Sequence, residues 1–139
     1  MRFTKQVVLD QPIERVRALT SDPDHPRHWQ PDLVGITRRT GTPGAPGATA
    51  TLKYRTFTFE ETVLSATADE RVSRNEMTGM VHTITNRFSA IDDRHTLLVC
   101  DNEFELSGLL RLAGRVLEKT LREQVERNVA HFKAFIDAG

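Results

Sequence analysis

The segment from about Ser107 to Asp137 has the pattern of one long, unbroken amphipathic helix, and it follows a series of strand-like segments. A helix of about 30 residues is about 45 Å long, which is more than is needed to cover one end of a small domain. A curved sheet that grips such a helix can bury its apolar face and also enclose space. The charged opposite face excludes a membrane span. The apolar residues recur at nearly helical spacing: Leu106, Leu110, Ala113, Leu117, Leu121, Val125, Val129, Phe132 and Ile136.

Length and composition indicate one ordinary domain. No tail or low-complexity tract divides the 139 residues, so residues 1–139 are expected to form a single domain. Lys and Arg together number 19, as do Asp and Glu, and a chain without a basic face is not expected to bind nucleic acid. The single cysteine, Cys100, cannot form an internal disulfide, and the first residues lack the apolar core of a secretory signal. These features predict a cytoplasmic protein.

The part of the chain before the long helix reads as strands with two short helices near the start. A strand over 2–9 is followed by a helix from Ile13 to about Thr20, and a second short helix ends at His28 or Trp29, before Pro31. Short turns between the later strands predict an antiparallel meander, because a parallel sheet needs longer crossovers. The later strands are expected at 33–40, 48–56, 57–67, 71–78, 81–90 and 95–106.

Several pieces of sequence carry a resemblance to a known family: Asp10 to Val16 after the first strand, His28-Trp29-Gln30-Pro31, Gly41 to Gly47, Thr96-Leu97-Leu98, and the terminal helix. In this order, over essentially the whole chain, they resemble the START-related helix-grip (SRPBCC) superfamily, and within it the polyketide cyclase/dehydrase and lipid-transport group. The resemblance implies an α+β helix-grip fold, with a curved antiparallel sheet of about seven strands, two short helices after the first strand and one long C-terminal helix. Members range from ligand carriers to cyclases and co-chaperones, so the resemblance implies a fold more than an activity.

Alternation along the strands predicts which side chains face the interior. The expected ligand-binding residues comprise an apolar set and a polar set. The apolar set is Trp29, Leu52, Tyr54, Phe59, Phe88, Phe104, Leu110 and Leu117, and the polar set is Glu61, Arg74, His82, Asn86 and Asn102. For Trp29, a structural role between the short helices and the sheet is favoured over ligand contact.

The fifth strand leaves two orientations open, because polar residues occur at both parities. The set Val72, Arg74 and Glu76 is expected to face inward, and Ser73, Asn75 and Met77 are the other choice. Pairing across short hairpins then places Glu61 near Glu76, Glu76 near His82, and Asn86 near Cys100.

A polar end beside apolar walls suits an amphipathic molecule. The leading hypothesis is therefore binding, with or without transport, of a small hydrophobic ligand such as a lipid, polyketide, quinone or isoprenoid. The alternative is a polyketide cyclase/dehydratase in which His82 acts as base and Glu61 or Glu76 as acid. A third is an interaction module with a packed interior. Turnover, ligand identity and the choice between monomer and homodimer stay open.

A second cluster of chemical interest comprises Asp22, Asp24, His25 and His28. These are metal-ligand types, but Pro23 and Pro26 constrain the loop and no closed metal spacing is present. No metal and no cofactor are therefore expected. Stable insertion into a membrane is not expected either, because the long helix is charged along one face.

Overall fold

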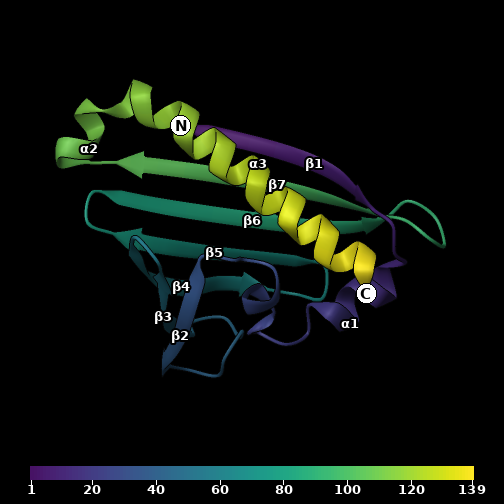
Figure 1. Ribbon diagram of the computed structural model, residues 1–139. Helices are drawn as coiled ribbons and strands as arrows, with labels where there is room; N and C mark the ends of the chain where they lie inside the picture. Colours follow the sequence, from purple (N-terminus) through teal and green to yellow (C-terminus); the bar gives the residue numbers. More distant parts are fainter.

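The computed structural model describes residues 1–139, which form seven strands and three α-helices with one short 3-10 helix (Figure 1). The chain begins with β1, α1 and the 3-10 helix η1, continues through β2 to β7, and ends with α2 and α3. The bounds are β1 Arg2–Leu9, α1 Ile13–Leu19, η1 His25–His28, β2 Leu33–Thr40, β3 Thr49–Tyr54, β4 Thr58–Ala66, β5 Glu70–Met77, β6 Met80–Ala90, β7 Thr96–Leu106, α2 Gly108–Leu112 and α3 Gly114–Ala138.

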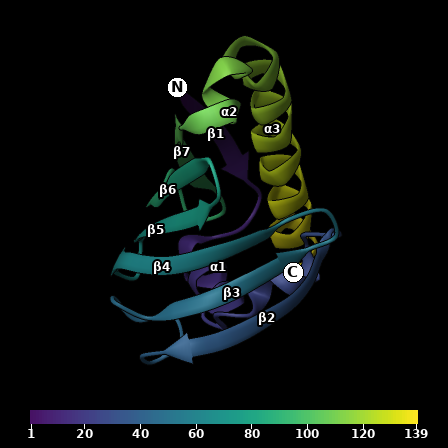
Figure 2. The ribbon, with the colours of Figure 1, turned by 90° about the vertical axis from the view of Figure 1, so that its left-hand side faces the viewer.

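The strands form one antiparallel sheet in the order β1-β7-β6-β5-β4-β3-β2. Consecutive strands from β2 to β7 are neighbours, and β1 closes the order by pairing with β7. Figure 2 shows that the sheet is strongly bent, with β2, β3 and β4 turned away from the plane of β5 to β7 and α3 lying along the concave side. The α+β helix-grip fold and the meander expected from the sequence are confirmed.

The turn between β5 and β6 contains only Thr78 and Gly79, so Met77 pairs with Met80. Gly79 has a φ of 85°, a backbone conformation that is strained for other residues. This register pairs His82 with Asn75, so the predicted inward orientation of Arg74 and Glu76 is wrong. An expected pair across the next hairpin, Asn86 with Cys100, is confirmed.

The prediction of one unbroken C-terminal helix is also wrong, because the helix breaks at Ala113. Ala113 has φ −91° and ψ 10°, outside the helical range, and glycines at 108 and 114 flank the break where helix propensity is low. The short helix α2 instead lies against the β5–β6 hairpin, where the Ser107 amide donates to the Gly79 carbonyl at 2.9 Å.

The apolar core consists of two separate clusters. The larger cluster joins β1, β7 and α1 to the buried face of α3, which contributes Val125, Val129, Phe132 and Ile136. The smaller cluster lies at the far end of the sheet, among β2, β3 and β4, and contains Leu33, Ala50, Leu52 and Phe59. Met80 packs against both. Between the two clusters, the concave wall of the sheet carries polar side chains.

Candidate functional site

The central row of the concave wall crosses five strands and is mainly polar. Directly paired residues lie on the same face of an antiparallel sheet. Pairing therefore places Glu61 of β4, Asn75 of β5 and His82 of β6 side by side, between Ala50 of β3 and Phe104 of β7. Asn75 is 7% exposed and His82 is 8% exposed. The middle of the wall thus presents a carboxylate, an amide and an imidazole to the interior.

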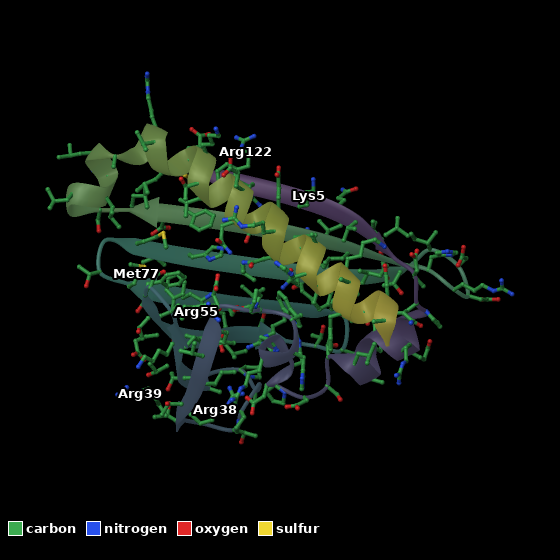
Figure 3. The ribbon with its side chains drawn as sticks, viewed as in Figure 1. Lys5, Arg38, Arg39, Arg55, Met77 and Arg122 are labelled. Atoms are coloured by element: carbon green, nitrogen blue, oxygen red, sulfur yellow. The ribbon has the colours of Figure 1, made fainter.

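Two further rows extend this polar surface toward α1. Ser73 and Asn102 belong to the first, in which Ser73 pairs with Ile84 and Ile84 with Asn102. Arg71 and Asn86 pair in the second. Apolar rows flank the polar ones on both sides: toward the β5–β6 hairpin they contain Leu52, Phe59, Met77 and Met80, and toward α1 they contain Phe88 and Leu98. Met77 marks the hairpin end in Figure 3.

His82 lies in a short chain of hydrogen bonds within this wall. Its Nε2 is 2.9 Å from Asn102 Oδ1, and Asn102 Nδ2 donates to Cys100 Sγ at 3.2 Å. The imidazole stacks on Phe104 with ring centroids 4.0 Å apart. Burial lowers the pKa of His82 to about 4, although the bond to Asn102 opposes this shift. The ring is therefore neutral at pH 7, with Nε2–H donating to Asn102.

Glu61 and Arg71 form an ion pair on the wall, with Arg71 NH2 3.2 Å from Glu61 Oε1. The Glu61 side chain is only 12% exposed and that of Arg71 28% exposed. Tyr54 donates its hydroxyl hydrogen to Gln30 Oε1 at 2.6 Å, and burial, followed by the charge of Glu61, raises the pKa of this phenol. The positive charge of Arg71 is therefore balanced within the protein by the carboxylate of Glu61.

We expect substitution of one partner of this pair to destabilise the fold. Glu61→Gln leaves the Arg71 charge partly buried without a counter-charge, which costs about 1–3 kcal/mol in the free energy of unfolding. The double variant Glu61→Gln/Arg71→Met removes both charges and is expected to lose less than the two single variants together. Urea unfolding of the four proteins measures this coupling. Additive losses would show that the two side chains do not interact.

The residues considered as metal ligands have other partners in the structure. His25 Nδ1 accepts a hydrogen bond from Trp29 Nε1 at 3.0 Å, Asp24 pairs with Arg38, and Asp22 Oδ1 accepts from the Asp24 amide at 2.9 Å. Burial, with a contribution from the Arg71 charge, lowers the pKa of His25 to about 4. His25 is therefore a neutral residue at the edge of the interior.

Two polar atoms of the wall are buried without a hydrogen-bond partner: Asn75 Oδ1 and Arg71 Nε. Unpaired buried polar atoms are uncommon and costly, so each calls for an explanation. Other inward-facing residues, among them Tyr54, Ile84, Asn86 and Phe88, are only partly buried. These side chains leave part of the concave side open to solvent.

The structure brings together most of the residues predicted for the site. Glu61, His82, Asn86 and Asn102 share the polar rows, and Trp29 packs against the larger core cluster, 5.2 Å from Phe132 between ring centroids. The helical residues are less central, because Leu117 is half-buried and Leu110 packs beside Gly79. The remaining apolar candidates, all on the concave side, are Leu52, Tyr54, Phe59, Phe88 and Phe104.

Arg74 and Glu76 lie on the outer face, where they pair with each other at 2.6 Å and their side chains are nearly half exposed. Both side chains therefore point away from the interior. Arg74 is not placed for the expected ligand contact, and Glu76 is not placed for the acid role considered for it. Of the catalytic candidates, only Glu61 and His82 face inward. One strand separates them, which corresponds to about 10 Å between backbones.

The sequence interpretation did not name Arg71 and gave Ser73 and Asn75 only as the orientation that it did not favour. It weighed His25 only as a metal ligand and did not name Gln30 as a site residue. The first three follow from one signal, the two-residue turn Thr78-Gly79, which makes Asn75 the partner of His82. His25 and Gln30 lie in irregular segments, where strand alternation gives no orientation. Two hollows of the surface lie outside this interior, one along the charged face of α3 and one between β1 and α3 near Lys5 and Arg122 (Figure 3).

Comparison with protein families gives one match that spans nearly the whole chain. A family model described as polyketide cyclase / dehydrase and lipid transport matches residues 1–136. A search of curated proteins finds no significant sequence match.

Solved structures resemble this fold at low sequence identity. A START superfamily protein from Mycobacterium smegmatis is 15% identical, with 99% of this chain and 97% of that chain covered and a TM-score of 0.78. The Zhui aromatase/cyclase from Streptomyces sp. R1128 is 16% identical, with coverage of 99% and 92% and a TM-score of 0.78. A protein from Thermus thermophilus is 15% identical, with coverage of 99% and 98% and a TM-score of 0.69. At these identities the likeness shows the fold.

Proposed function

The chain belongs to the polyketide cyclase/dehydrase and lipid transport family, and on that premise we propose that it binds a small amphipathic molecule between the concave sheet and α3. The polar rows around Asn75 and Arg71 take the polar part of the ligand. The flanking apolar rows take its hydrocarbon part. Binding of this kind suits a carrier that shelters its ligand from water.

The observation that carries the proposal is the pair of unsatisfied buried atoms, Asn75 Oδ1 and Arg71 Nε. A ligand with a hydroxyl hydrogen for the first atom and an oxygen for the second would satisfy both. Arg71 is already paired with Glu61, so the wall has no excess charge at this point. These features favour a neutral oxygenated head, such as a hydroxyl or keto group, over a carboxylate or phosphate.

Native mass spectrometry of gently purified protein, together with thermal-shift assays, tests the proposal. The panel contains hydroxylated polyketide-type aromatics, quinones, isoprenoid alcohols and a fatty acid. We expect a neutral oxygenated compound to raise the melting temperature in proportion to the logarithm of its concentration. Absence of any carried mass and of any shift across the panel would contradict the proposal.

Asn75→Leu is expected to move stability and affinity in opposite directions. Leucine has a similar volume and removes the unsatisfied amide, so the unliganded protein should keep its stability or gain about 1 kcal/mol. The same change removes a hydrogen bond to the ligand, and we expect about tenfold weaker binding. Calorimetry and urea unfolding measure the two effects.

The matched control is Arg74→Leu, one residue away on the outer face. It should leave ligand affinity unchanged because its side chain points away from the interior. Equal loss of affinity in both variants would show that the effect comes from distortion of β5. Unchanged affinity in Asn75→Leu would place the ligand elsewhere.

A further inference from the structure

The turn from α2 into α3 carries three large apolar side chains that are almost fully exposed. Leu109 is 83% exposed, Leu112 85% and Val116 76%. The other large apolar residues on the surface are scattered, and the most exposed of them, Ile91, reaches 52%. Concentration of exposed apolar surface at one place is characteristic of an interaction site. We call Leu109, Leu112 and Val116 the apolar tip.

Two unpaired cations accompany the apolar tip. Arg111 and Arg115 are exposed, and neither takes part in an ion pair within the protein. The next acid along the chain, Glu118, pairs with Arg122 at 3.4 Å. The tip therefore combines exposed apolar side chains with excess positive charge, the combination that binds anionic lipid surfaces.

The position of the tip suits contact with a flat surface. Figure 1 shows α2 projecting at the end of the molecule opposite α1 and the C-terminus, and Figure 2 shows it at the end of the long axis of α3. Leu110, between two tip residues, faces the other way and packs so closely on the β5–β6 hairpin that a Cβ on Gly79 would lie 2.9 Å from Leu110 Cδ1. This contact fixes α2 while the tip stays free.

We propose that the apolar tip docks on an anionic lipid bilayer, with Leu109, Leu112 and Val116 in the interfacial layer and Arg111 and Arg115 against lipid phosphates. None of the helices combines the length and hydropathy needed to cross a bilayer, so the contact is peripheral. The tip adjoins the apolar end of the concave wall, because Met80 pairs with Leu106 just before α2. Docking would bring that end of the interior to the membrane surface.

Co-sedimentation with vesicles tests this proposal on the full chain. We expect the wild-type protein to sediment with vesicles of phosphatidylcholine mixed with phosphatidylglycerol, and more weakly with phosphatidylcholine alone. Salt at about 1 M, where the screening length is about 3 Å, should reduce the binding. The triple variant Leu109→Ser/Leu112→Ser/Val116→Ser and the double variant Arg111→Gln/Arg115→Gln should each bind at least about tenfold more weakly. Ile91→Ser is the control and should bind as wild type.

Wild-type protein that ignores anionic vesicles, or a triple variant that binds them normally, would overturn the proposal. Sedimentation velocity adds a third outcome. If the wild-type protein is a dimer that binds no vesicles, and the triple variant is a monomer, the tip is a contact between two copies of the chain. This result would also overturn the proposal. Ligand binding in solution is measured in parallel. Because the tip lies outside the concave wall, its variants should keep ligand affinity, so failure of either proposal leaves the other standing.

Discussion

Phe132→Ala is expected to destabilise the protein by about 3–5 kcal/mol, the range for removal of a buried phenylalanine. Phe132 is 7% exposed and joins three parts of the fold. Its ring lies 5.2 Å from Trp29, just after η1, and 6.0 Å from Phe88 in β6, measured between centroids, while its backbone belongs to α3. The loss combines the transfer of the ring with the cavity left among these neighbours, and denaturant unfolding measures it.

Two further variants serve as controls for this prediction. Phe132→Leu keeps most of the volume and should cost much less than alanine. Phe57→Ala removes the same side chain from a site that is 36% exposed, so a smaller loss than that of Phe132→Ala is expected there. A loss below about 1 kcal/mol for Phe132→Ala would mean that α3 does not depend on this contact for its position over the sheet.

The strands were the most predictable part of this fold. Strand-like segments bounded by turn and capping residues predicted β1 and β2 with the bounds that the structure shows, Arg2–Leu9 and Leu33–Thr40. Each further strand agrees within a few residues. This follows from geometry, because a half-buried strand must alternate and a short turn must join antiparallel neighbours.

The break in the C-terminal helix could not be read from periodicity, because Leu110, Ala113 and Leu117 continue the apolar stripe across it. Two other signals pointed to it. Glycines at 108 and 114 weaken the helix, and Leu109 and Leu112 lie off the stripe, where a single gripped helix would expose them. The exposed leucines therefore follow from their place off the apolar stripe, and they are the basis of the proposed membrane contact.

The inward or outward orientation of the candidate side chains was predicted correctly where apolar neighbours determined it, and wrongly where they did not. On β6 and β7, apolar neighbours such as Phe88 and Leu98 determine the inward face, so His82 and Asn102 were placed correctly. On β5 both faces are polar, so alternation alone does not show whether Asn75 or Arg74 faces the interior. Only the register of the hairpin decides between them, and it selects Asn75.

The polar rows between the two apolar clusters carry groups that lower the stability of the fold. Asn75 Oδ1 and Arg71 Nε lack partners, and two histidines are held neutral by burial. A fold selected for stability alone would replace such groups with packed apolar residues. Their presence on the concave wall is therefore consistent with recognition of a ligand, at the expense of stability in its absence.

The two buried histidines should make stability fall steeply in mild acid. His25 and His82 each have a folded pKa of about 4, below the ordinary value of 6.5. Above pH 6.5 both states are neutral and stability does not depend on these groups. Between pH 6.5 and 4 the unfolded chain binds protons that the folded chain does not. Over this whole range, each of the two histidines lowers the free energy of unfolding by about 3 kcal/mol.

Urea unfolding at a series of pH values measures this effect, and the histidine variants separate it from the aspartates with lowered pKa, Asp69 and Asp101 among them, which contribute only below about pH 5. His25→Gln and His82→Gln should each make the decline between pH 6.5 and 4 shallower by about 3 kcal/mol. His131→Gln, on the exposed face of α3, should leave it unchanged. A decline of the same steepness in all four proteins would mean that neither imidazole is kept from protonation by the fold, and the interior would then admit water freely around His82.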